Sequence, residues 1–123
     1  MNLAAVTCLL PVFEGLDREA DEESVSFACD RLRNALSEID GFIPFDWPSW
    51  CDKAFGFMLS PSLIQEADLA TIFKLITFHF RQNRFVDGHL EEVVRTGLIL
   101  RALRRIHEVD GASLGWRSVQ VGC

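Results

Sequence analysis

An apolar stretch over residues 68–80 constrains the fold more than any other part of this sequence. Five large apolar side chains recur there at the spacing of one helical face: Leu69, Ile72, Phe73, Ile76 and Phe80. Leu75 and Phe78 lie off this stripe, so the helix is apolar on more than half of its circumference and needs neighbours on at least two sides. The sequence therefore predicts an all-α fold, a single compact orthogonal helical domain of about five to six helices around a central apolar helix at about residues 68–81.

Helical spacing and capping signals predict the remaining elements. The predicted helices cover residues 3–13, 22–39, 48–59, 88–95 and 98–109, with a short helical turn through residue 65. Glycine is the usual residue just past a helix end, which makes Gly41, Gly97 and Gly111 the predicted stops. We predict one α-helical domain over residues 1–110, followed by a loosely ordered C-terminal tail over residues 111–123.

The charge of the chain limits its partners. The net charge is −6, and residues 1–60 carry eleven acids and four bases (−7) against seven acids and eight bases (+1) in residues 61–123. Attraction to phosphates needs a surplus of positive charge, so direct nucleic-acid binding is not expected. The apolar run over residues 3–13 is too short to span a bilayer and follows no basic residue, so we expect neither a membrane anchor nor a signal peptide.

The four cysteines are far apart in the sequence, at Cys8, Cys29, Cys51 and Cys123. No pair has the spacing of a zinc knuckle or a redox C-x-x-C motif. Two of them fall on apolar helix faces, where a thiol behaves as a small hydrophobe. We therefore expect reduced thiols in a cytoplasmic protein, with no cofactor and no metal.

The histidines and the known catalytic motifs give little support to an enzyme. His79, His89 and His107 are ten and eighteen positions apart and form no H-x-x-x-H pattern. His79 flanks the apolar stripe, which favours a half-buried, hydrogen-bonded histidine over a ligand or a catalytic base. The sequence has no P-loop or G-x-G-x-x-G motif, and no Ser, Cys or Lys is visibly placed to act as a nucleophile, so catalysis is the less favoured interpretation.

One set of polar residues suggests a binding site, comprising Asp46, Trp47, Arg84, Asp87 and His89. Arginine presents a fixed fork of donors that pairs with carboxylates or phosphates, so Arg84 is the natural centre of such a site. The competing structural interpretation is that Arg84 ties its corner to Asp46 or to helix-end carbonyls, while Asp87 caps the following helix. The sequence favours this structural interpretation.

Two charged surfaces are further candidates. The acidic one comprises Glu19, Asp21, Glu22 and Glu23, and the basic helix face comprises Arg101, Arg104 and Arg105. The acidic surface could meet a basic partner, and the basic face could bind an acidic partner or a phosphate. The structural interpretation is again simpler, because such residues usually form solvated helix faces that pair with each other.

Several short motifs resemble those of a known family. They are residues 10–14 (LPVFE), 42–47 (FIPFDW) with Trp50, 67–77 (ADLATIFKLIT) and 84–90 (RFVDGHL), followed by Gly97 and residues 103–105 (LRR). Together they resemble a family of small prokaryotic proteins called domain of unknown function 6508, over most of residues 8–107. Residues 15–23 depart from the family by being shorter and more acidic. The resemblance implies an intact fold and a prokaryotic or phage source, and it implies no activity.

The leading functional hypothesis is a small cytoplasmic, non-catalytic α-helical protein that binds another protein. One alternative is a phage or mobile-element inhibitor whose acidic surface occupies a nucleic-acid-binding site of a host defence complex. A second alternative is a small-ligand-binding protein or enzyme with its site at Arg84, Asp87 and His89. Self-association as a homodimer is also consistent with the apolar central helix and with Trp116 in the tail.

Overall fold

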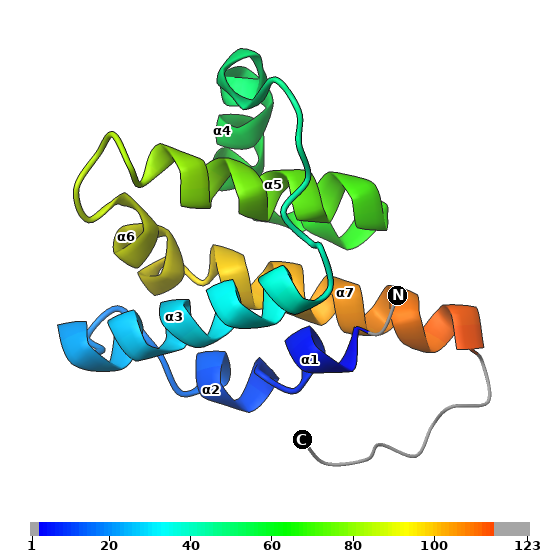
Figure 1. Ribbon diagram of the computed structural model, residues 1–123, viewed down its shortest axis with the longest axis horizontal. Coiled ribbons are helices and arrows are strands. Elements are labelled where there is room, and N and C mark those ends of the chain that lie inside the picture. Colours follow the sequence, from blue (N-terminus) through cyan, green and yellow to red (C-terminus); the bar gives the residue numbers. More distant parts are fainter. Residues whose placement is uncertain (1–2, 115–123) are drawn as a thin grey trace.

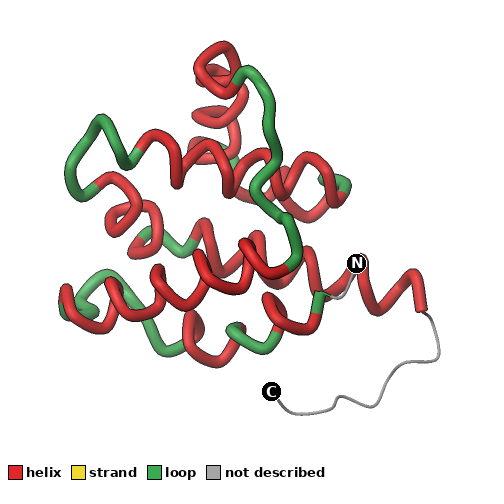
Figure 2. Tube along the Cα trace, viewed as in Figure 1, coloured by secondary structure: helices red, strands yellow, loops and turns green. Residues whose placement is uncertain are grey.

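The computed structural model describes residues 3–114, with side chains for residues 3–110, as an assembly of helices (Figures 1 and 2). Within these residues the elements are α1 (Ala4–Thr7), α2 (Leu10–Glu14), α3 (Glu22–Glu38), the 3-10 helix η1 (Trp47–Trp50), α4 (Cys51–Leu59), the 3-10 helix η2 (Pro61–Glu66), α5 (Leu69–Gln82), α6 (His89–Arg95) and α7 (Leu98–Leu114). This part of the chain contains no strand, so the predicted all-α fold is confirmed. None of its helices has the length and apolar character needed to cross a membrane.

Helix α5 occupies the position predicted for the central helix. It contacts α7, α6, η1 and α4, and Figure 1 shows α4 on one side of it and α3 with α7 on the other. Ile72, Phe73 and Ile76 are buried, as are Leu75 and Phe78 beside the stripe. The helix therefore has packing partners around most of its circumference, which is the arrangement that its apolar sequence requires.

The predicted single helix over residues 3–13 is wrong, because two short helices, α1 and α2, take its place. In a continuous helix the N–H of residue 11 would bond to the carbonyl of Thr7, and Pro11 has no N–H to give. The helix is interrupted after Thr7, and Pro11 enters the first turn of α2. Val6, Leu9 and Phe13 are nevertheless buried, so the segment belongs to the core as expected.

Helix α7 is longer than predicted. The sequence suggested an end at residues 110–111, and the helix continues to Leu114. One glycine in a helix costs only about 1 kcal/mol relative to alanine, which is too little to end a helix by itself. The predicted loose tail over residues 111–123 is therefore helical in its first four positions, and residues 115–123 lie outside the described part of the chain. Ala102, Leu103 and Ile106 face the core as predicted.

The segment over residues 42–50, which joins α3 to α4 and which we call the aromatic connection, crosses α5 (Figure 1). The backbone N–H of Ile43 donates to Thr77 Oγ1 at 3.1 Å. The ring of Phe42 meets Phe80 edge-on with centroids 5.2 Å apart, and Trp47 meets Phe78 at 5.9 Å. These contacts hold the connection on the C-terminal half of α5.

The turn after α3 depends on close packing at Gly41. Asp40 has a left-handed backbone conformation, with φ of 54°. Gly41 donates its N–H to the carbonyl of Leu36 at 2.8 Å. A Cβ atom on Gly41 would lie 2.8 Å from Leu36 Cδ2 and 3.3 Å from Phe73 Cε1. Both neighbouring side chains are buried and have little room to move. The glycine is therefore required for close approach, whereas the sequence suggested a helix stop.

Replacement of Gly41 by alanine is expected to lower the free energy of unfolding by about 1–3 kcal/mol, because it overpacks this contact. The matched control is Gly56→Ala in α4, where a Cβ would meet nothing within 4 Å. That change is expected to raise stability by about 0.5–1 kcal/mol, because alanine favours the helix. Urea unfolding followed by far-UV circular dichroism measures both. Equal effects of the same sign would contradict the packing argument.

Candidate functional site

A pair of histidines lies where the end of α5 meets α6. His79 is fully buried, and its Nδ1 lies 2.9 Å from Nε2 of His89. The two rings stack with centroids 5.1 Å apart. His79 Nε2 is buried and has no hydrogen-bond partner among the described residues. The sequence predicted a half-buried histidine at this position, and the structure places it deeper and pairs it with His89.

Both histidines are neutral near pH 7, because the pKa of each ring is lowered. Burial, together with the neighbouring His89, lowers the pKa of His79 to about 3, and burial also lowers the pKa of His89. One ring must therefore donate the shared hydrogen to the other. His79 is closed to solvent, and its hydrogen bond with His89 links α5 to α6. The described residues contain no group of three potential metal ligands.

The structure does not gather the predicted polar site into one place. Arg84 and Asp87 are both exposed. Helix α6 begins after Gly88, with φ of 78°, and the cap is provided by Asn83, whose Oδ1 accepts the N–H of Leu90 at 2.9 Å. Asp87 therefore does not provide the side-chain cap that the structural interpretation proposed. His89 is bonded to His79, as described above.

Arg84 lines a pocket that Asp46 and Trp47 do not line. The pocket has a volume of about 280 Å³, lies at the ends of α3 and α5, and is also lined by Arg33 and Arg81. The carbonyl of Asp46 accepts a hydrogen bond from Ser49 Oγ at 2.8 Å. Trp47 packs against Phe85, with centroids 5.8 Å apart. The contacts described for these two residues are therefore with the aromatic connection, with α5 and with Phe85, and none of them is with Arg84.

The acidic surface divides into a capping residue and a groove. Asp21 caps α3, with its carboxylate accepting from Ser24 N at 3.0 Å and from Ser24 Oγ at 2.7 Å. The hydrogen bond from the Ser24 side chain, followed by that from its backbone, lowers the pKa of Asp21. An open groove of about 690 Å³ between α3 and α6 is lined by five acidic residues, one aromatic residue and one serine: Asp21, Glu22, Glu23, Asp30, Glu91, Phe27 and Ser26. We call it the acidic groove, and Glu19 is not part of its lining.

Three carboxylates of the acidic groove lack an ion-pair partner among the described residues. Glu22, Glu23 and Glu91 form no ion pair within residues 3–110. Phe27 lies among them with 58% of its surface exposed. Sequence reasoning found the acids of the first turn of α3, but it missed Phe27 and Glu91. Only the contact between α3 and α6 brings Glu91 to this groove.

The basic helix face serves mainly to hold the fold together. Arg104 pairs with Glu14 at 3.3 Å, and Arg105 donates through Nε to the carbonyl of Ala67 at 2.8 Å. Arg101 is exposed and has no ion-pair partner among the described side chains. Arg104 and Arg105 thus connect α7 to α2 and to the residue that follows η2. The ion pair of Arg104 with Glu14 is the kind of pairing that the structural interpretation expected, whereas the bond from Arg105 to Ala67 was not predicted.

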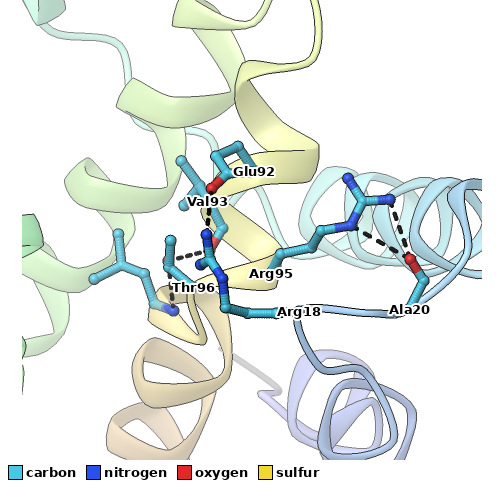
Figure 3. A network of polar contacts seen from close by, with 7 residues as sticks. Arg18, Ala20, Glu92, Val93, Arg95 and Thr96 are labelled. Carbon is cyan, nitrogen blue, oxygen red and sulfur yellow. Dashed lines mark hydrogen bonds and ion pairs between the residues drawn. The ribbon is translucent and has the colours of Figure 1, made fainter.

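A second set of arginine contacts joins the segment before α3 to α6 (Figure 3). Arg18 pairs with Glu92 at 3.2 Å. Arg95 donates from Nε and Nη2 to the carbonyl of Ala20, at 3.4 and 3.2 Å. These contacts fix residues 18–20 against α6, next to Asp21 in the lining of the acidic groove.

The comparison with protein families gives one match. The family described as "Family of unknown function (DUF6508)" matches residues 19–111. The chain belongs to this family. The DUF6508 match covers the acidic groove, the histidine pair and the pocket at Arg84, and it leaves α1 and α2 outside. No curated protein and no solved structure matches the chain.

Proposed function

We propose that this DUF6508 protein acts by binding a partner protein, and that it holds a basic segment of that partner in the acidic groove. The observation that carries the proposal is the presence of three carboxylates without ion pairs, within the described residues, around an exposed aromatic ring. A monomer gains little from leaving Glu22, Glu23 and Glu91 together, because like charges repel one another. Lysine or arginine side chains from a partner would remove this repulsion.

Phe27 supports a protein as the occupant. An exposed ring within a charged groove can contact the aliphatic stem of a lysine or the plane of an arginine. The guanidinium of Arg31 already lies over the Phe27 ring, 5.7 Å from its centroid, which indicates that the ring accepts a cation on one face. Aromatic anchors surrounded by polar residues are typical of protein interfaces.

Reversing two charges of the acidic groove tests the proposal. We expect Glu23→Lys/Glu91→Lys to weaken partner binding by at least about tenfold, because both the attraction and the steering are lost. The matched control is Glu38→Lys/Glu66→Lys, which changes the net charge equally at two exposed carboxylates outside the groove. Asp21 is left intact because it caps α3.

The three proteins are immobilised in parallel to capture partners from the native host, and each captured partner is then purified and titrated by calorimetry. We expect a partner to be retained by the unchanged protein and by the control, but not by the groove variant. Binding should also weaken as the salt concentration rises. A partner that binds the groove variant as tightly as the control would exclude the acidic groove.

The same experiment separates an inhibitor from an ordinary binding protein. Carboxylates without cations can stand in for the phosphates of a nucleic acid, as the phage-inhibitor alternative requires. Under that alternative the captured protein binds DNA or RNA, and an added oligonucleotide displaces it from the acidic groove. Simultaneous binding of the oligonucleotide and this protein would exclude the alternative and leave the binding function intact.

A further inference from the structure

We propose that the pocket at the ends of α3 and α5 is a binding site for a phosphate monoester. We call it the arginine pocket, and its wall is made by Arg33, Arg81 and Arg84 around the rings of Phe42 and Phe80. Its volume of about 280 Å³ is at the lower end for ligand sites, which suits a small ligand. It is separate from the acidic groove, and no residue lines both.

The aromatic rings orient two of the guanidinium groups. Arg33 lies over the ring of Phe80 at 5.3 Å, and Arg81 lies over the ring of Phe42 at 5.6 Å. The two rings are themselves fixed edge-on to each other at 5.2 Å. A guanidinium stacked on a ring keeps its N–H donors in its own plane, where they remain free to bond to an anion.

The other polar groups of the pocket also favour an anion. Asn83 Oδ1 already accepts the N–H of Leu90, which leaves its amide NH₂ as a donor. Ser37 adds a hydroxyl group that can donate. No carboxylate lines the pocket. Every polar side chain around the cavity can therefore donate a hydrogen bond, and only a ligand rich in acceptors would satisfy them together.

The positive charge of the arginine pocket favours a ligand with two negative charges. Arg33 is paired with Asp30 at 2.7 Å. Arg81 and Arg84 form no ion pair within the described residues, and this leaves two positive charges without compensation. A phosphate monoester carries about two negative charges near neutral pH and offers three acceptor oxygens, whereas a carboxylate carries one charge. The arginine pocket matches the phosphate in both charge and hydrogen bonding.

The simpler alternative is that these arginines only stabilise the C-terminal end of α5, where cations are favoured by the helix dipole. That alternative accounts for Arg81 in the last turn, and it predicts no saturable binding of anions. Under that alternative Arg33, which comes from α3, only pairs with Asp30 and contacts the ring of Phe80.

The test is a calorimetric titration at about pH 7.5, where the monoester is a dianion. The probes are glycerol phosphate and inorganic phosphate, with acetate at matched ionic strength. We expect both phosphates to bind saturably and at least about tenfold more tightly than acetate. Tighter binding of glycerol phosphate than of inorganic phosphate supports a monoester. The reverse order overturns the monoester assignment in favour of free phosphate.

Arg84→Gln is expected to weaken phosphate binding by at least about tenfold, because it removes one of the two uncompensated charges. Arg84 is exposed and its side chain makes no hydrogen bond or ion pair among the described residues, so the fold should be unaffected. Arg33→Gln, on the other side of the pocket, should act in the same direction. The control Arg101→Gln removes an exposed arginine from α7 and should leave binding unchanged. Absence of saturable binding, equal binding of acetate, or an equal loss in the control would overturn the proposal.

Discussion

Lowering the pH from about 6.5 to about 4 is expected to destabilise the protein through His79. Its pKa is about 3 in the folded state and 6.5 in an exposed histidine, so the unfolded chain binds the proton more tightly. The stability that comes from keeping this ring neutral is complete above about pH 6.5 and falls as the pH drops toward 3. The maximum slope is about 1.4 kcal/mol per pH unit.

The measurement is a series of urea-unfolding curves across this pH range. His89, whose pKa is also lowered by burial, adds to the slope with the same sign. The capping carboxylates of Asp21 and Asp68 also have lowered pKa values, because each accepts hydrogen bonds from the residue three positions later. Their contribution is lost only below about pH 4, where carboxylates titrate, so it does not overlap with the upper part of the histidine range.

The variant His79→Phe distinguishes the contribution of His79 to the pH dependence of stability from the contributions of these other groups. Phenylalanine has a similar shape and no charge, so the variant should retain stability near pH 5 better than the unchanged protein. The control is His107→Gln, which alters an exposed histidine on α7 and should leave the pH profile as it is. An unchanged acid slope in His79→Phe would show that another group causes it.

Phe78→Ala is expected to lower the free energy of unfolding by about 3–5 kcal/mol, a large part of the 5–15 kcal/mol typical of a domain. Phe78 is fully buried. Its ring lies 5.9 Å from Trp47 and 6.5 Å from Phe55, and the His79 ring lies 5.2 Å away. Truncation would leave a cavity beneath the aromatic connection that these rigid neighbours cannot fill.

The matched control is Phe85→Ala. Phe85 also contacts Trp47, at 5.8 Å, but 73% of its surface is exposed. Because truncation of Phe85 removes little buried area, it should lower the free energy of unfolding by less than about 1 kcal/mol. The two urea midpoints give the comparison directly. If Phe85→Ala were as destabilising as Phe78→Ala, the exposed stacking on Trp47, rather than burial of Phe78, would stabilise this region.

The parts of the fold that could be predicted from the sequence depend on short-range patterns. The stripe on α5 has the helical period, and Asp68 caps that helix by accepting the N–H of Thr71 at 2.8 Å, as its position suggested. Pro11 shows the limit of this reasoning. A proline is compatible with a first turn and with a break, and only the structure distinguishes a long helix from the pair α1 and α2.

The candidate sites depend on contacts between distant segments, so single-sequence reasoning recovered only parts of them. Arg81 and Arg84 are three positions apart in the sequence, but Arg33 joins them from α3, far away in the chain. His79 meets His89 only because the chain reverses at Gly88. Neither the arginine pocket nor the histidine pair can be predicted from periodicity or capping, because both depend on how α3 and α6 are placed relative to α5.

Helix α7 has a consequence for how the protein is made. It contacts α1, α2, η2, α5 and α6, and it buries Ala102, Leu103 and Ile106 among them. During synthesis the earlier helices leave the ribosome before this partner exists, with the apolar faces that it covers still open to water. Stable tertiary structure is therefore expected only after translation has passed α7, and nascent chains that stall earlier should depend on chaperones to remain in solution.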